Sequence, residues 1–270
     1  MIRDKAGKAH WDSVWQEPPR VPSELIPGGL RGHIRRTHHR YFQRLFNGIE
    51  TRRLHLLEIG CARSFWLPYF AREFGFEVHG LDYSEIGCRQ AAAMLERYSV
   101  RGETTCADAF SPPEPLVGAF DVVTSFGVVE HFENTAGCLR AFSRFLKPGG
   151  MLITLIPNMA GLAGALQKLI CRRVFDMHVP MSSERLGKSH QDAGLSVIEC
   201  GYLVFNHFGV CNAGSRQSPL WSVKQAALGL LTGVSAGFWL AESLGIPLKP
   251  NRWTSAYVCC SARAARQPPQ

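Results

Sequence analysis

The stretch LHLLEIGCARS, residues 54–64, decides the fold class. Its apolar residues form the nearly continuous run that is typical of a strand covered on both faces. Glu58 lies near the end of this run. Small residues follow it, which is what a backbone needs where it passes close to a ligand: Gly60, Cys61, Ala62 and Ser64. The stretch therefore predicts a buried strand that runs into a tight turn, with an acid beside the turn.

A second apolar run, FEVHGLDYSE, reaches Asp82, 22 positions after Gly60. An acid at about this offset, at the end of the second strand of a doubly wound sheet, is placed to bind ribose hydroxyls. The turn pattern ExGxAxS alone is weak, because a tight strand-to-helix turn in any α/β protein could look similar. The pattern gains meaning only from the segments that follow it.

Three further segments have the same strand-then-loop character. CADAF (106–110) places Asp108 at the end of a third strand. FDVVTSFGVVEHFEN (120–134) predicts a fourth strand, a loop and a helix start. FLKPGGMLITLIPN (145–158) predicts a helix end, a Pro-Gly-Gly turn and a fifth strand. Together with the first two runs, these segments give five strands in regular succession.

The order and spacing of these five pieces resemble the class I S-adenosylmethionine-dependent methyltransferases, and within them the small-molecule branch that includes the ubiquinone and menaquinone biosynthesis enzymes. The resemblance covers roughly residues 54–200. It implies an α/β, Rossmann-like, seven-stranded and mostly parallel sheet with an antiparallel last strand and helices on both faces. It also implies S-adenosyl-L-methionine as the cofactor and S-adenosyl-L-homocysteine as the product.

The chain divides into three predicted parts: an N-terminal helical extension or lid (1–50), a methyltransferase domain (51–262) and a loose tail (263–270). Within the domain, two apolar segments are predicted to be helical insertions at the substrate pocket, 159–180 and 205–250. Strands are expected at 54–59, 76–81, 103–106, 120–125, 151–156, 195–200 and 253–262. Helices are expected at 32–47, 84–98, 134–146, 159–175 and 182–193, with Ser84 as an N-cap.

Composition is that of an ordinary globular protein, with 46% hydrophobic and 19% charged residues among 270. The net charge of +8 permits attraction to nucleic acid, anionic lipid or an acidic substrate without selecting one. Nine scattered cysteines without zinc spacing, and an N-terminus without an apolar core, favour a cytoplasmic protein with reduced thiols.

The segment 219–248 carries no charge from Gln225 to Ala241, a length at the bottom of the range for a membrane span. Three glycines dilute its hydrophobicity. We expect a core or substrate-pocket helix here. An interfacial helix that dips into a membrane is the second interpretation, and a true span is the third.

The residue types at the strand ends suit the three parts of the implied cofactor. Glu58 and the backbone of Gly60, Cys61 and Ala62 suit its amino acid end, because the turn opens a helix N-terminus. Asp82 suits the ribose hydroxyls. Asp108 and Ala109 suit the adenine, and either Tyr83 or Phe110 could pack on the base.

Two further groups border the predicted methyl end. Phe126 and Gly127 end the fourth strand beneath the sulfonium. By resemblance, aromatic residues of the first helix close over the methionine end, and Trp11 and Trp15 are the candidates. A purely structural role of the two tryptophans in the extension is an equal alternative.

Glu130 and His131, just after the fourth strand, are the predicted catalytic pair. Methyl transfer is largely positioning and desolvation, and a base is needed only if the acceptor must lose a proton. His131 would serve as that base. In the ubiquinone O-methyltransferases a Glu-x-x-Glu-His run at this place can bind a divalent metal. Gly127 replaces the first Glu here, so no metal is predicted, although Asp176 or His178 could complete a site.

The predicted function is methylation of a small, apolar or aromatic molecule, with O-methylation favoured over N- or C-methylation. A membrane-surface quinone or lipid methyltransferase is the first alternative, with a peripheral membrane contact. An RNA methyltransferase and an inactive cofactor-binding protein are further alternatives. No nucleic-acid partner is predicted, because strand four is followed by SFGV rather than an NPPY-type tetrapeptide.

Overall fold

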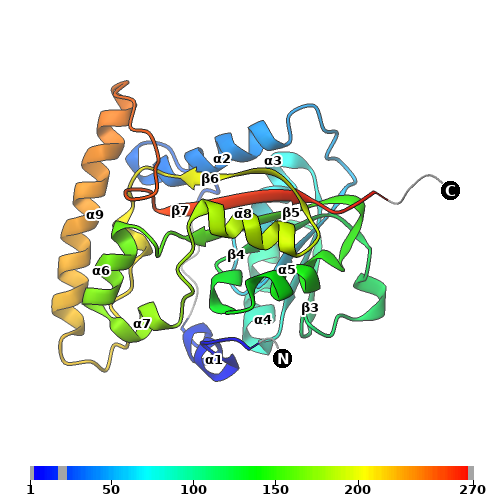
Figure 1. Ribbon diagram of the computed structural model, residues 1–270, viewed down its shortest axis with the longest axis horizontal. Coiled ribbons are helices and arrows are strands. Elements are labelled where there is room, and N and C mark those ends of the chain that lie inside the picture. The colour runs from blue at the N-terminus through cyan, green and yellow to red at the C-terminus, as the bar shows by residue number, and fades with distance from the viewer. Residues whose placement is uncertain (1–2, 18–22, 267–270) are drawn as a thin grey trace.

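A seven-stranded sheet with helices on both faces forms the centre of the protein (Figure 1). The computed structural model describes residues 3–17 and 23–266. The strand order is β3-β2-β1-β4-β5-β7-β6, and β7 runs antiparallel to both of its neighbours while the other pairs are parallel. The predicted fold class is confirmed.

The strands agree with the expected ranges to within a few residues at most ends. They are β1 (His55–Ile59), β2 (Glu77–Asp82), β3 (Gly102–Cys106), β4 (Phe120–Phe126), β5 (Leu146–Pro157), β6 (Ser196–Leu203) and β7 (Tyr257–Arg263). The helices are α1 (Lys8–Trp15), α2 (His33–Leu45), α3 (Trp66–Phe74), α4 (Glu85–Arg97), α5 (Thr135–Ser143), α6 (Leu162–Ile170), α7 (Arg172–Asp176), α8 (Ser183–Asp192) and α9 (Trp221–Ser243). Short 3₁₀ turns lie at Leu30–Gly32, Glu114–Leu116, Val129–His131 and Phe208–Val210.

Alternation along the strands feeds two separate apolar cores, one on each face of the sheet. In β1, Leu57 and Ile59 join the core that α5 and α8 cover. Leu56 points to the opposite face and joins the core that α2, α3 and α4 cover. The strand is therefore buried on both sides, as its continuous apolar run predicts.

The turn after β1 lies where the strand order reverses, because β2 follows on one side of β1 and β4 lies on the other. Gly60 takes φ +79°, a left-handed value that favours glycine, and an added Cβ would lie 2.4 Å from Val128 Cγ2. Gly127, at the end of the neighbouring β4, takes φ +72°. Crevices at such a reversal are where open α/β sheets bind their ligands.

Two of the predicted boundaries are wrong. Residues 147–150 were expected to form a turn before the fifth strand, but β5 already begins at Leu146 and its pairing with β4 shifts between Phe120 and Val122. A bulge absorbs the glycines without ending the strand. The single helix expected at 159–175 is two helices, α6 and α7, because Cys171 between them is extended.

The helix α9 is not a core helix. Of its residues only Leu228, Ser235 and Trp239 are buried, and the helix stands at one edge of the molecule beside α6 (Figure 1). Among the residues that the structure describes, no helix combines the length and apolarity needed to cross a membrane.

The predicted extension forms two helices with different roles. The helix α2 packs Tyr41 and Phe42 into the core beside α3, whereas α1 buries no residue completely and lies near the N-terminal end of α4. Of the predicted tail, Arg263 still belongs to β7, and residues 267–270 lie outside the described part of the chain. The division into lid, domain and tail stays a prediction.

Candidate active site

A cavity opens at the strand-order reversal, and we call it the switch-point cavity. It is lined by residues from the ends of β1, β2 and β4, from the start of α3 and from α1. Its lining comprises Asp4, Trp11, Trp15, Glu58, Gly60, Ala62, Ser64, Phe65, Trp66, Asp82, Tyr83, Phe126, Gly127, Val128, His131 and Phe132. Most of the predicted cofactor residues thus meet in one place, although they come from four separate segments.

Glu58 presents an unpaired carboxylate oxygen at this cavity. Its Oε1 accepts a hydrogen bond from Ser64 Oγ at 2.7 Å, whereas Oε2 is buried and has no partner among the described residues. Burial raises the pKa of Glu58 to about 8. A buried carboxyl with a free oxygen is suited to receive a cationic group.

Ser64 has two roles that the sequence did not reveal. Besides donating to Glu58, its hydroxyl accepts a hydrogen bond from the backbone N–H of Trp66, at the first turn of α3. The residue that replaces the third glycine of the family pattern therefore orients the acid and supports the helix start at the same time.

Asp82 closes β2 and is held by two backbone donors. Its Oδ2 accepts from the N–H of Ala62 at 3.1 Å, and its Oδ1 accepts from the N–H of Ser84 at 2.8 Å. A carboxylate has about four acceptor positions, so two remain for hydroxyl groups. Burial raises its pKa, and the two backbone hydrogen bonds oppose that shift.

Ala62 occupies the place of the second glycine, and the structure shows how the extra methyl group is accommodated. A Cβ added to Gly87 of α4 would lie 2.6 Å from the Cβ of Ala62. A glycine on the facing helix therefore provides the space that Ala62 takes up. The N-cap predicted at Ser84 is confirmed, since its Oγ accepts from the N–H of Gly87.

The first helix lies over the cavity through aromatic and polar contacts. Trp11 and Trp15 stack at 5.6 Å between ring centroids. Asp4, just before the helix, accepts hydrogen bonds from Trp11 Nε1 at 3.2 Å and from Tyr83 Oη at 2.9 Å. Both tryptophans line the cavity, so the predicted proximity is present, while their role in cofactor binding stays a prediction.

Five predicted residues do not line the cavity. Cys61 is buried within the apolar core. Asp108 is exposed and accepts from the N–H of Phe110, while Ala109 and Phe110 pack against the core on the α5 side. The adenine role of Asp108 and Ala109 therefore remains a prediction that the lining of this cavity does not support. Glu130, the fifth, is buried and does not reach the lining.

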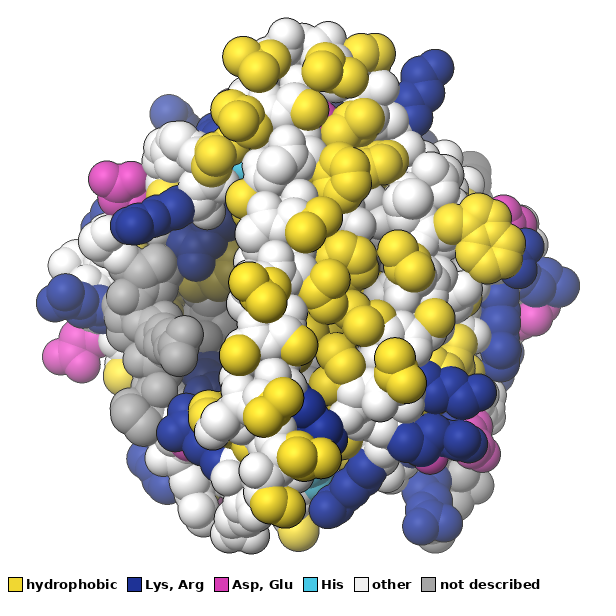
Figure 2. Space-filling view, turned by 90° about the vertical axis from the view of Figure 1, so that its left-hand side faces the viewer, with side chains coloured by type: hydrophobic (Ala, Val, Ile, Leu, Met, Phe, Trp, Pro, Cys, Tyr) yellow, Lys and Arg dark blue, Asp and Glu magenta, His cyan; other side chains and the backbone are white. Residues whose placement is uncertain are grey.

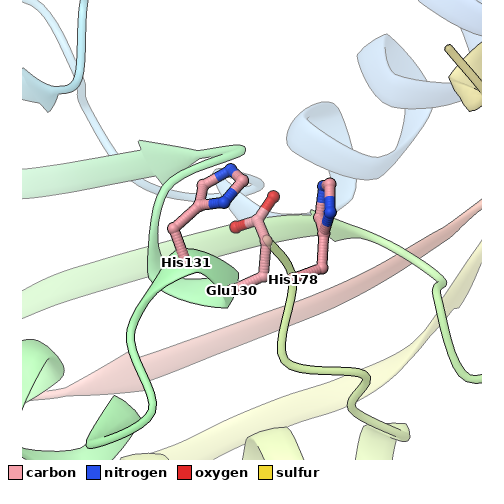
Figure 3. A group of neighbouring side chains, drawn as sticks. All are labelled: Glu130, His131 and His178. Carbon is pink, nitrogen blue, oxygen red and sulfur yellow. The ribbon is translucent and has the colours of Figure 1, made fainter. Parts of the chain in front are cut away.

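Glu130 and His131 are joined by His178, a residue 47 positions further along the chain, and Figure 3 shows the three side chains together. One ligand atom from each residue lies within 4.8 Å of the other two. The Nδ1 of His131 contacts the carbonyl oxygen of Met177 at 3.0 Å, and the Nδ1 of His178 contacts that of Val174 at 2.8 Å. A carbonyl can only accept, so each Nδ1 carries the proton and each Nε2 is left as the basic nitrogen.

Burial sets the protonation of the catalytic pair. It lowers the pKa of His131 to about 4, with the nearby His178 acting in the same direction. It raises the pKa of Glu130 to about 8, and Glu130 Oε2 has no partner within the described part of the chain. At neutral pH the imidazole is thus neutral and the carboxyl is protonated. The same three groups could hold a divalent ion if Glu130 lost its proton.

A second cavity, which we call the aromatic cavity, adjoins the first and has a volume of about 410 Å³. The two cavities share Phe65, Trp66, Phe126 and Gly127. The remaining lining of the aromatic cavity is Arg31, Ile34, Arg35, His38, Leu155, Pro157, His207 and Tyr257. Its size is that of a small-ligand site.

Two histidines with buried ring nitrogens give the aromatic cavity its polar character. His38 Nε2 and His207 Nδ1 are buried without a hydrogen-bond partner in the described residues. Burial lowers the pKa of each to about 4, so both rings are neutral at pH 7. From the sequence, His207 is only a weak candidate for a pocket residue, within the predicted 205–250 insertion. His38 is not predicted as a site residue, because a histidine on an amphipathic helix gives no signal of what it faces.

Comparison with known proteins agrees with this geometry. A family model described as "Methyltransferase domain" matches residues 30–200. The ubiquinone biosynthesis O-methyltransferase of Pseudomonas paraeruginosa is 27% identical over 169 residues, which are 58% of this chain and 72% of that protein.

Two solved structures share the fold. The phosphoethanolamine N-methyltransferase 2 of Haemonchus contortus, in complex with S-adenosyl-L-methionine, has a TM-score of 0.58 and 16% identity, covering 97% of this chain and 59% of that one. The geranyl diphosphate C-methyltransferase of Streptomyces coelicolor, in complex with Mg²⁺, geranyl diphosphate and S-adenosyl-L-homocysteine, has a TM-score of 0.56 and 14% identity, covering 94% and 97%.

The chain belongs to the methyltransferase-domain family of class I S-adenosylmethionine-dependent methyltransferases. It is an enzyme of that class, and S-adenosyl-L-methionine is its cofactor. The switch-point cavity fits this cofactor, since the unpaired Oε2 of Glu58 suits an ammonium group and the free acceptor positions of Asp82 suit a pair of hydroxyls.

Proposed function

We propose that the protein methylates a small aromatic or apolar molecule, with a hydroxyl oxygen as the favoured acceptor atom. The observation that carries this proposal is the aromatic cavity, which shares Phe126 and Gly127 with the switch-point cavity. A ring held there would lie beside the site of the cofactor. Walls of Phe65, Trp66 and Tyr257 favour a flat apolar body.

The cofactor supplies an activated methyl group when bound, so the protein's contribution is to orient the acceptor and exclude water. In this proposal Glu58 and Asp82 hold the cofactor, and His38 and His207 contact polar groups of the acceptor. His207 would be the contribution of the 205–250 insertion to the acceptor site.

His131 is the proposed base for a hydroxyl acceptor. Its ring is fixed by the contact of Nδ1 with Met177 O, which leaves Nε2 free to accept the hydroxyl proton. The ring also lies edge-on to Trp11 at 5.0 Å between centroids, so it is shielded from bulk water. The Glu130 carboxyl and the His178 imidazole are the polar neighbours of the imidazolium that would form.

The experiment that tests this proposal is an acceptor screen. The purified protein is incubated with S-adenosyl-L-methionine carrying a labelled methyl group and with phenols, catechols and quinols, and the products are identified by mass spectrometry. We expect an O-methylated product from at least one of them. Transfer of the label only to amines, acidic carbons or RNA would overturn the choice of oxygen.

Two variants make the screen specific. Asp82→Ala should lose cofactor binding in calorimetry and all turnover with it. His131→Gln should keep cofactor binding but lose about 100-fold or more in turnover of a hydroxyl acceptor. Equal turnover by His131→Gln and the wild type would remove the base from the proposal while leaving the cofactor site intact.

A further inference from the structure

Of the thirteen large apolar side chains that the described residues leave exposed, ten come from one part of the fold. They belong to α6, α9 and the segments that flank α9: Leu162, Leu169, Leu220, Val223, Leu230, Val234, Leu240, Leu244, Ile246 and Trp253. We call this surface the α6/α9 face. Figure 2 shows it as a band of apolar side chains that runs the length of the molecule.

The apolar band has a basic border. The segments 159–178 and 215–253 together contain seven basic residues and two acidic ones. Blue side chains lie at the margins of the band in Figure 2. Two of the seven are paired, Arg172 with Asp176 at 2.9 Å and Arg216 with Glu17 at 3.3 Å. Glu242 is half-buried, 3.1 Å from His33. The other five basic residues form no ion pair with the described residues, so the border keeps a net positive charge. The basic residues are Lys168, Arg172, Arg173, Arg216, Lys224, Lys249 and Arg252.

We propose that the α6/α9 face is a docking surface for an anionic lipid membrane, on which α9 lies in the plane of the interface. An interfacial helix combines an apolar face that enters the acyl boundary with basic residues that contact anionic headgroups. The 23 residues of α9 span about 35 Å, a length over which such a helix can bind without crossing the bilayer. The exposed Trp253, next to Arg252, is a residue type that anchors proteins at the headgroup level.

Charge favours a membrane over a second copy of this chain. Two copies that met through the same face would bring the same positive borders together, and like charges oppose such contact. An anionic surface complements them. A dimer through this face is therefore the competing outcome that the experiment must exclude.

The inner side of α9 connects this surface with the aromatic cavity. Trp239 Nε1 donates to the carbonyl oxygen of Asn206 at 2.7 Å, and Ser235 Oγ donates to Asn206 Oδ1 at 2.6 Å. The next residue, His207, lines the aromatic cavity and lies 5.4 Å from the ring of Trp239. Docking through α9 would thus place the aromatic cavity beside the lipid, so that an apolar acceptor could enter the cavity from the membrane. Only this entry of the acceptor rests on the proposed function.

Flotation with lipid vesicles tests the docking surface directly. The full chain is mixed with vesicles of phosphatidylcholine alone or with phosphatidylglycerol added, and the floating fraction is measured at low and high salt. We expect binding that requires phosphatidylglycerol and weakens with salt. Absence of the wild type from the floating fraction of the vesicles that contain phosphatidylglycerol would overturn the proposal.

Paired variants locate the surface. Leu230 is 76% exposed and Val234 52% exposed, so the double variant Leu230→Glu/Val234→Glu should fold normally and bind vesicles about tenfold more weakly or worse. The matched control is Ile198→Glu, an exposed apolar residue on β6 that is 46% exposed and lies outside the face. Equal loss in both, or in neither, would overturn the assignment.

Two further measurements complete the test. Calorimetry with S-adenosyl-L-methionine verifies that each variant is folded. Light scattering measures the mass of the wild type and of each variant in solution. If the wild type is a dimer that does not float with vesicles, and the double variant is a monomer, the face binds a second copy of the chain instead. Because flotation needs no acceptor, its failure overturns only the docking surface, whereas an empty acceptor screen overturns only the proposed function.

Discussion

At the scale of single residues, Glu58 and Glu130 form an instructive pair. Both are buried glutamates, each has an oxygen without a partner among the described residues, and burial raises the pKa of each to about 8. Only Glu58 lines the switch-point cavity. Their difference therefore lies in what each faces, and this makes one the natural control for the other.

We predict that affinity for S-adenosyl-L-methionine rises with pH between about 6 and 7.5. A carboxyl whose pKa is about 8 must release its proton to pair with an ammonium group, so binding below that pH is linked to proton release. The expected slope is at most about tenfold per pH unit. Calorimetry in buffers of different ionisation enthalpy measures both the affinity and the released proton. Glu58→Gln should abolish the dependence and Glu130→Gln should keep it.

The same shift has a consequence for folding. Since the folded state holds a proton on Glu58 that the unfolded state loses above about pH 4.5, this group's contribution to stability falls as the pH rises from 4.5 to 8. When the cofactor is bound, the folded state prefers the ionised form of Glu58, because the carboxylate then pairs with the ammonium group.

A pH dependence of cofactor affinity that survives in Glu58→Gln would contradict the assignment of Glu58.

Metal removal is the second prediction at this scale. We predict that dialysis against EDTA leaves turnover and cofactor affinity unchanged, as expected from the replacement of the first family glutamate by Gly127. The physical reason is that Glu130 is protonated at neutral pH and a protonated carboxyl is a poor ligand. Turnover lost on chelation and restored by Zn²⁺ or Mg²⁺, with His178→Ala unable to recover, would show instead that the cluster of Glu130, His131 and His178 is a metal centre.

At the scale of elements, the helices α1 and α9 contribute no residue to the two cores of the sheet, but each contacts one of the two cavities. The helix α1 lies over the cavity through Trp11 and Trp15 and is tied to the N-cap of α4, where Ser84 Oγ donates to Asp12 Oδ1 at 2.6 Å. The helix α9 holds the loop of His207 on its inner side. Each helix thus bears on one cavity.

We predict that Trp11→Ala weakens cofactor binding about tenfold, because the indole covers the cavity beside His131 and its loss admits water. Trp253→Ala, which removes an exposed indole that is not part of the cavity lining, should leave the affinity unchanged. Calorimetry measures both. A lower melting temperature in Trp11→Ala with unchanged affinity would mean that the two tryptophans only stabilise the extension.

At the scale of the whole molecule, the cofactor site connects parts that are distant in sequence: the ends of β1, β2 and β4 and the helix α1. Such a site does not exist in the unfolded chain. Binding free energy is therefore added in full to the free energy of unfolding.

We predict that S-adenosyl-L-methionine at about 100 times its Kd stabilises the protein by about 2.7 kcal/mol. For a chain of this size, that corresponds to a rise in melting temperature of roughly 5 to 10 °C. Thermal unfolding followed by circular dichroism measures the shift, and Asp82→Ala should show none. An unchanged melting temperature of the wild type at saturating cofactor would mean that the site is not formed as described.

The central sheet can be predicted from the sequence, because strands, caps and turns are local patterns. The apolar run of β1, the N-cap at Ser84 and the acids at the ends of β1 and β2 were all readable from residues close together in the chain. The parallel arrangement then places those ends at one edge of the sheet, so the positions of Glu58 and Asp82 also followed.

Contacts between residues that are far apart in the chain could be found only in the folded structure. In the fold, His178 lies beside Glu130 and His131. His38 and His207 line the aromatic cavity, whereas Asp108 lies outside the switch-point cavity. The helix α9 leaves its apolar side on the surface. No local pattern encodes these outcomes, since each depends on where loops and insertions return to the sheet. Hydrophobicity shows that a helix such as α9 has an apolar face, but only the packing of the remaining chain determines whether that face is covered.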